Sequence, residues 1–218
     1  MYYFLLLVRC LILAFSMLGY ALFCVNRLKI KPDLIPVLVS ASIALTMYLA
    51  GLLNLMKPMV WIIVLVGIAS AVWFAAFKRN FIDATKQLAT PGIFFFAVCV
   101  VFVFLLCRGS RLISYDNFSH WGLIVKQMWI DERLPNFSNT LIFFPTYPPG
   151  SAMFLYFVTT VLYRNESQML MAQNILLLSC IAPLFSFIKN PKNIFAYLIL
   201  LPTAVFVAVF ALPMNSLL

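Results

Sequence analysis

The chain has 218 residues, of which 65% are hydrophobic and only 10% are charged, and its mean hydropathy is +1.05. A soluble domain carries about 25% charged residues, so this composition excludes a soluble enzyme and a disordered chain and indicates an integral membrane protein. The formal net charge is +9, but the basic residues lie in short loops between apolar runs, where membrane orientation requires them. We therefore expect no nucleic-acid partner.

Six apolar stretches are long enough to cross about 30 Å of hydrocarbon. None of them alternates with a period of two, so we expect helices and not barrel strands. The predicted spans cover residues 5–25, 34–53, 59–77, 91–107, 169–188 and 194–212. The first span contains Arg9 near its start, from where we expect the long side chain to reach the lipid headgroups.

A seventh apolar run, residues 151–163, is too short to span and is expected to be interfacial or re-entrant. If it does not cross, the inner loops carry eight basic residues in 26 positions and the outer segments carry six in 66. This is the usual excess of basic residues on the cytoplasmic side of a membrane protein. The inner loops are then 26–33, 78–90 and 189–193, and the outer segments between spans are 54–58 and 108–168. We therefore predict an all-α polytopic membrane protein with about six transmembrane helices, both ends outside, and one or two amphipathic surface helices in the long external loop 108–168.

The scarce titratable groups gather in this external loop. It holds four of the six acidic residues and the only histidine, namely Asp116, Asp131, Glu132, Glu166 and His120. The other two acids, Asp33 and Asp83, lie beside basic residues in inner loops, where we expect them to act as loop solubilisers. A membrane protein with its titratable groups on one side has either a site or a solvated loop there, and position alone leaves both open.

The stretch that begins at Tyr115 opens a helical pattern, for which Asp116 is a suitable N-cap. An apolar stripe consists of Phe118, Trp121, Val125, Met128 and Trp129, and the opposite face holds Asp116, His120, Gln127 and Asp131. This pattern predicts a helix on the outer membrane surface. Asp116 and His120 are four positions apart, so their side chains can meet. The carboxylate can serve as a general base or as a cation ligand, and helix capping or packing is the structural alternative.

Two further features of the loop suit a substrate site. Residues 146–150 contain two prolines that give a rigid entry to the short apolar run. Arg164 lies at the outer membrane edge, where its planar guanidinium suits a lipid phosphate, although a snorkelling arginine or an ion pair with Glu166 is an alternative. The five cysteines fall within the predicted spans without metal-ligand spacing, and we assign no metal ligand.

These features together resemble the first external loop of the GT-C superfamily of membrane glycosyltransferases, which includes protein O-mannosyltransferases and the lipid A aminoarabinose transferase. The resemblance lies in Tyr-Asp-Asn-Phe-Ser-His-Trp (115–121) and Tyr-Pro-Pro-Gly (147–150), followed by two closely spaced spans. It covers about residues 91–218. Residues 1–90 would then form an N-terminal three-span unit, and residues 91–218 a GT-C-like unit with two further spans after the loop.

The resemblance implies transfer of a sugar from a polyprenyl-phosphate carrier to an acceptor at the outer face of the cell membrane. The family's leading aspartate, which matches Asp116, acts at the acceptor hydroxyl or helps to bind a metal, so a divalent cation stays open as a cofactor. With the polar face described above, this predicts Asp116 and His120 as catalytic residues. The predicted substrate-binding residues are Asn117, in place of a second acid, Tyr147, in place of a lysine before the Pro-Pro motif, Arg164 and Glu166.

Family members are usually much longer and have a second external loop that often supplies another acid. We therefore expect the chain to be the N-terminal part of such an enzyme, or to work with a partner chain that supplies the missing spans. The alternative is a non-catalytic membrane scaffold or a subunit that binds the lipid carrier. The scarcity of charges within the spans argues against a transporter.

Overall fold

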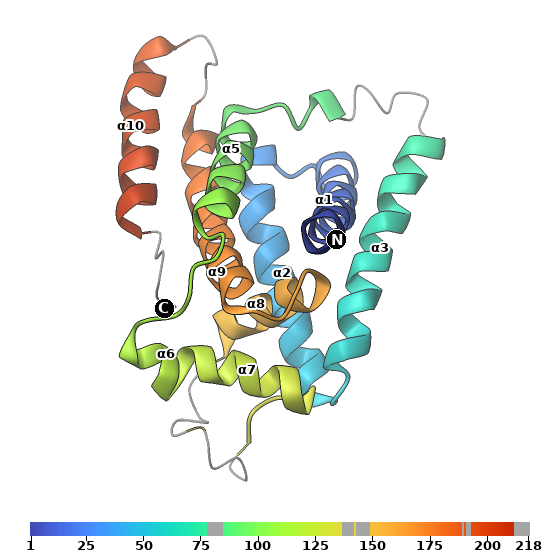
Figure 1. Ribbon diagram of the computed structural model, residues 1–218. Coiled ribbons are helices and arrows are strands. Elements are labelled where there is room, and N and C mark those ends of the chain that lie inside the picture. Colours follow the sequence, from blue (N-terminus) through green and yellow to red (C-terminus); the bar gives the residue numbers. More distant parts are fainter. Residues whose placement is uncertain (78–84, 137–141, 143–148, 189, 191–192, 212–218) are drawn as a thin grey trace.

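The computed structural model describes residues 1–77, 85–136, 142, 149–188, 190 and 193–211, and within these ranges every regular element is a helix (Figure 1). Four described helices are long and apolar enough to cross a membrane. They are α1 (Tyr2–Asn26), α2 (Ile35–Leu52, after the 3₁₀ turn η1, Pro32–Leu34), α3 (Met56–Phe77) and α9 (Glu166–Ile181, continued by the 3₁₀ turn η2, Ala182–Phe187). The protein is therefore an all-α membrane protein, as predicted.

The two other predicted spans are apolar but shorter helices. They correspond to α5 (Pro91–Leu106) and α10 (Ile194–Ala211), whose apolar stretches run over Pro91–Leu106 and Ile194–Phe210. Figure 1 shows α10 at one edge of the molecule, where it contacts α9 and η2. Most of its large apolar side chains are exposed, as in Phe195 and Phe210 at 76% each, which suits a helix that faces lipid.

The short apolar run forms α8 (Gly150–Val161). Its 12 residues extend about 18 Å, too little to cross the hydrocarbon. Met153, Tyr156 and Thr159 are fully buried, because α8 packs against α2 and α9 and also contacts α7 and α3. Its length fits the re-entrant alternative, and its burial on all sides contradicts a helix that lies on the membrane surface.

The predicted outer and inner segments lie at opposite ends of the bundle. One end gathers the starts of α1, α3 and α9 and the end of α5, and α6 (Tyr115–Ser119) and α7 (Trp121–Asp131) lie across it (Figure 1). The opposite end holds η1, η2 and the start of α5, which contact one another. This arrangement has the predicted alternation of helix directions, and the assignment of one end to the outside stays a prediction.

Asp33 corrects one expectation at the opposite end. Its side chain is only 7% exposed and accepts hydrogen bonds from Thr90 Oγ1 at 2.5 Å and from the Gly92 amide at 3.1 Å. Thr90 is the N-cap of α5, and its hydroxyl oxygen accepts from the Ile93 amide. Asp33 is therefore not a loop solubiliser, because it fastens η1 to the first turn of α5. Asp83 lies outside the described residues.

Small residues allow α1 and α3 to approach closely. A Cβ atom on Gly19 would lie 1.9 Å from the Gly67 carbonyl oxygen, so only glycine fits at this position. Hydrogen bonds cross the same contact, from Ser16 Oγ to the Val64 carbonyl at 3.0 Å and from the Tyr20 hydroxyl to the Ile63 carbonyl at 2.6 Å. Close backbone approach with side-chain hydrogen bonds is the usual way in which helices associate inside a bilayer.

Candidate functional site

The predicted surface helix is interrupted at His120. Its backbone angles, φ −151° and ψ −56°, separate α6 from α7. A Cβ atom on Gly122 would lie 2.6 Å from Leu112 Cδ1 and 2.9 Å from the Asn117 carbonyl oxygen, so the glycine lets the turn fold back on the incoming chain. Ser114 is the N-cap of α6, and Asp116 lies in its first turn. The prediction that Asp116 is the N-cap is therefore wrong.

The three site residues predicted in this turn have different environments. Asp116 is exposed, and Asn117 is only 2% exposed. His120 is half-buried, and its ring lies 4.7 Å from the ring of Trp121. Asp116 is therefore the one whose side chain a substrate outside the fold can reach, whereas Asn117 belongs to the packed side of the turn.

The faces predicted for the surface helix are partly wrong. Val125 and Met128 are fully buried as expected, but Phe118 is 57% exposed because the break at His120 turns α6 away from the axis of α7. Gln127, predicted on the polar face, is only 8% exposed, and its Nε2 donates to Asp131 Oδ2 at 2.8 Å. The helix thus buries part of its polar face against the bundle.

Arg164 takes part in a charged cluster at the far end of α7. Its Nη2 lies 2.8 Å from Glu132 Oε1, and its Nη1 donates to the Trp129 carbonyl at 2.6 Å. The same carboxylate accepts from the Tyr156 hydroxyl and lies 3.4 Å from Lys57 Nζ. The partner of Arg164 is therefore Glu132, and the ion pair with Glu166 that the sequence left open does not form.

Glu166 is held by a residue in the middle of α7 and by the segment before α6. Its Oε1 lies 2.5 Å from Lys126 Nζ, and its Oε2 accepts from the Leu112 amide at 3.1 Å. These two contacts engage both carboxylate oxygens of Glu166. Glu166 thus anchors segment 108–114 to the start of α9.

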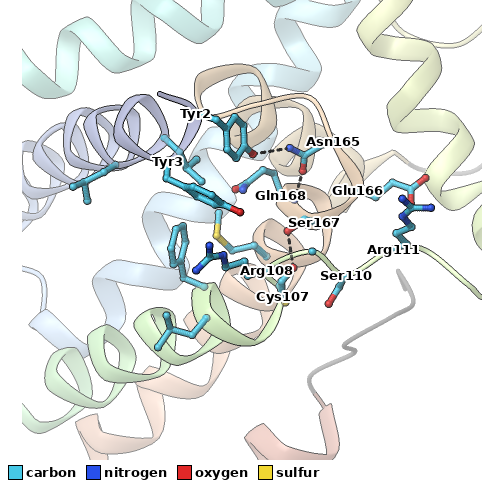
Figure 2. A pocket seen from close by; sticks show the side chains of 16 residues that line it. Tyr2, Tyr3, Cys107, Arg108, Ser110, Arg111, Asn165, Glu166, Ser167 and Gln168 are labelled. Atoms are coloured by element: carbon cyan, nitrogen blue, oxygen red, sulfur yellow. Dashed lines mark hydrogen bonds between the residues drawn. The ribbon is translucent and has the colours of Figure 1, made fainter.

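An amphipathic pocket of about 900 Å³ lies between the start of α1, the end of α5 and the start of α9 (Figure 2). Its polar lining includes Arg108, Ser110, Arg111, Asn165, Glu166 and Ser167, and its apolar lining includes Leu6, Leu7, Phe104, Leu105 and Met171. Tyr2 and Tyr3, the first residues of α1, complete the wall, and the Arg108 guanidinium lies 4.2 Å from the centre of the Tyr3 ring. The pocket therefore joins a cationic region to an apolar one.

Contacts with the chain after α8 fasten the start of α1 beside this pocket. Arg9 Nη1 donates to the Leu162 carbonyl at 2.5 Å, and its guanidinium lies 4.4 Å from the centre of the Tyr163 ring. Asn165 Nδ2 donates to the Tyr2 hydroxyl at 3.3 Å, while Asn165 Oδ1 caps α9 by accepting from the Gln168 amide at 2.9 Å. Arg9, predicted to reach the lipid headgroups, thus binds the end of α8.

The predicted site residues do not form one cluster in the structure. Glu166 lines the pocket, Asp116, Asn117 and His120 lie at the α6–α7 turn, and Arg164 lies at the other end of the 11-residue helix α7. Tyr147 falls outside the described residues. The sequence interpretation missed Arg108, Arg111 and Tyr3. The sequence did hold a signal for this pocket. Two arginines follow the apolar run that ends at residue 107, and two tyrosines stand at the start of the first apolar run.

In the described ranges, no three His, Cys, Asp or Glu side chains gather as they would to hold a metal ion. Comparison of the chain with protein-family models, with curated proteins and with solved structures gave no match. The structure thus defines a class only: an all-α membrane protein with a cationic, partly apolar pocket at the end of the bundle where α6 and α7 lie.

Proposed function

We propose that the chain is a membrane glycosyltransferase of the GT-C type, or the N-terminal part of one. It would take a sugar from a polyprenyl-phosphate carrier and pass it to an acceptor on the extracytoplasmic side of the cell membrane. The proposal starts from the sequence resemblance, and the observation that supports it most is the neighbourhood of Asp116. Segment 108–114 leads directly from the arginine-lined pocket to the helix that carries this exposed carboxylate.

The chemistry of the pocket suits the donor substrate. A polyprenyl phosphate has a long apolar chain and an anionic head, and the pocket offers Leu6, Leu7 and Phe104 beside Arg108 and Arg111. Arginine side chains bind phosphate oxygens through charge-assisted hydrogen bonds, which are about twice as strong as neutral ones. The two arginines would therefore hold the phosphate before transfer and stabilise it as it leaves.

In the proposed reaction, the acceptor hydroxyl attacks the anomeric carbon while Asp116 accepts the hydroxyl proton. The new bond joins the acceptor oxygen to the sugar, and the bond from the anomeric carbon to the phosphate oxygen breaks. The electron pair stays on the departing lipid phosphate, where Arg108 and Arg111 offset the negative charge. His120, at the helix break, is proposed to orient the acceptor beside Asp116.

One observation favours the non-catalytic alternative, a subunit that binds the lipid carrier without transferring the sugar. Arg164 and Glu166 were predicted to bind substrate, but both are engaged in ion pairs that join helices. The pocket can bind a carrier without these two residues taking part. This alternative predicts carrier binding and no turnover.

The test is sugar transfer by the full chain, with any partner chain that copurifies, from a panel of radiolabelled polyprenyl-phosphate sugars. Asp116→Asn should lower transfer by about 10²-fold or more, which is the usual contribution of a general base, and should leave carrier binding intact. Asp131→Asn is the matched control, because it makes the same carboxyl-to-amide change at the last residue of α7. Equal transfer by Asp116→Asn and the wild type at equal expression would refute the assigned base. Carrier binding without transfer by the wild type would favour the subunit.

A further inference from the structure

The first helix forms part of the pocket, although the resemblance covers only residues from about 91 onward. Tyr2, Tyr3, Leu6 and Leu7 line one side, facing the end of α5 and the start of α9 (Figure 2). The ring of Tyr2 also packs against Tyr163, with 4.9 Å between the ring centres. These contacts hold the start of α1 in place, so the N-terminal unit contributes to the binding surface and is more than an anchor.

Arg108 is positioned to receive an anion. Its guanidinium lies against the face of the Tyr3 ring, and among the described residues it has no carboxylate partner. A guanidinium that stacks on an aromatic ring keeps its N–H groups free at the edge, where they can bind two phosphate oxygens. Among the described residues that line the pocket, Glu166 is the only acid, and Lys126 already pairs with it. An anionic ligand would therefore meet a net positive charge.

Gln168 gives a second, independent indication of a ligand. It lines the pocket, is only 4% exposed, and its Oε1 has no hydrogen-bond partner within the described part of the chain. In Figure 2 its side chain points toward the side where Tyr2 and Tyr3 lie. A buried acceptor without a partner is energetically unfavourable, so a ligand that donates to it from a hydroxyl group would satisfy it.

The shape of the pocket indicates a lipid and not a small soluble anion. Its volume of about 900 Å³ is much larger than a phosphate requires. Leu7 of α1 and Leu105 of α5 both line the pocket and are 55% and 59% exposed, as suits side chains in contact with hydrocarbon. An apolar chain attached to the head could therefore continue between these helices into the bilayer.

We propose that this pocket binds the phosphate headgroup of a membrane lipid, with the first helix as one of its walls. Arg108 and Arg111 bind the phosphate, Tyr3 holds the Arg108 guanidinium, and Gln168 accepts a headgroup hydroxyl. The inference deepens the proposed function and rests on it only for the identity of the lipid, since a sugar carrier and an ordinary phospholipid share this chemistry.

The test is lipid binding by the purified full chain in phosphatidylcholine nanodiscs, measured by native mass spectrometry. The probes are polyprenyl phosphate, phosphatidic acid, phosphatidylglycerol and inorganic phosphate. Arg108→Gln should weaken binding of the lipid phosphates about ten-fold or more, because a charge-assisted hydrogen bond is lost. Tyr3→Leu should weaken it less, and Gln168→Leu should affect only the hydroxyl-bearing phosphatidylglycerol. Arg133→Gln, which removes an exposed charge elsewhere in the external segment, should change nothing.

Unchanged lipid binding in Arg108→Gln and in Tyr3→Leu would overturn the inference, as would binding of inorganic phosphate alone. If Arg108→Gln does not fold, Tyr3→Leu and Arg111→Gln carry the test. Binding of phosphatidic acid as tight as that of polyprenyl phosphate would support the headgroup site and, separately, count against the carrier in the proposed function. Preference for polyprenyl phosphate would support both.

Discussion

Removal of the Glu132 side chain should destabilise the protein, because this residue is the centre of the charged cluster at the far end of α7. Glu132 ends α7 in the left-handed conformation, with φ 54°, and its carboxylate joins three elements. It pairs with Arg164 and Lys57 and accepts from the Tyr156 hydroxyl. Glu132→Ala therefore removes the acceptor from a buried tyrosine and the counter-charge from an arginine in one step.

The magnitude follows from the exposure of each partner. Tyr156 is fully buried, so an unsatisfied hydroxyl costs about 1–3 kcal/mol. The Arg164 side chain is 31% exposed, so solvent screening reduces its contribution to about 1 kcal/mol. The Lys57 side chain is 60% exposed and should contribute less than about 0.5 kcal/mol. We expect Glu132→Ala to cost about 3 kcal/mol in total and Lys57→Ala almost nothing.

Buried thiols provide the assay. Cys24 and Cys107 are buried at 7% and 1% exposure, so a thiol-reactive dye will report their release when the protein unfolds in detergent. Glu132→Gln keeps an acceptor for Tyr156 and should fall between the alanine variant and the wild type. If Glu132→Ala and Lys57→Ala unfold at the same temperature as the wild type, the cluster does not fasten α7 to α3 and α8 and the reasoning fails.

The contacts of the Glu132 carboxylate should also make the stability of the protein depend on pH. Burial raises the pKa of Glu132, but hydrogen bonds from Tyr156 and Arg164 and the nearby positive charges outweigh it and hold the pKa below its usual value of 4.5. Because the pKa is lower in the folded protein, the stabilisation is complete above the usual value and is lost as the pH falls through the folded pKa. The stability gap between the wild type and Glu132→Gln should therefore be constant at neutral pH and narrow in acid.

Two further predictions concern helix contacts. Gly19→Ala should disrupt the α1–α3 contact, because the new Cβ atom would clash with the Gly67 carbonyl oxygen. Gly150→Ala is the control and should be neutral, because no atom lies within 4 Å of its Cβ position. Equal unfolding temperatures of the two variants in the dye assay would contradict this prediction. Asp33→Ala should cost about 1–2 kcal/mol, because the Gly92 amide and the Thr90 hydroxyl lose their acceptor. Slower amide exchange at the start of α5 in Asp33→Ala than in the wild type would refute that assignment.

The sequence predicted the helices well because apolar length is a property of the chain alone. The runs that became α1, α2, α3 and α9 can satisfy their backbone only within themselves in a bilayer. The break at His120 was missed because it depends on the approach of Leu112 to Gly122, a contact between neighbouring segments that periodicity does not encode. Helical periodicity alone would continue through both α6 and α7.

The partners of the charged residues were the hardest part to predict. Arg164 and Glu166 are two positions apart in sequence, yet Glu166 pairs with Lys126 in the middle of α7 and Arg164 pairs with Glu132 at its C-terminal end. Asp33 was assigned to solvent for the same reason, since its partner Thr90 is 57 positions away. Arg108 drew no attention because its significance depends on Tyr3, at the far end of the sequence.

The most direct test of the account is whether Asp116 and its neighbours lie outside the cell. In a background without the five native cysteines, Tyr115→Cys, at an 81% exposed position beside Asp116, and Leu28→Cys, at a 54% exposed position at the opposite end of the bundle, would be treated with a membrane-impermeant thiol reagent. The account predicts that Tyr115→Cys reacts in intact cells and Leu28→Cys only after permeabilisation. The reverse pattern would place the pocket and Asp116 in the cytoplasm and contradict the account.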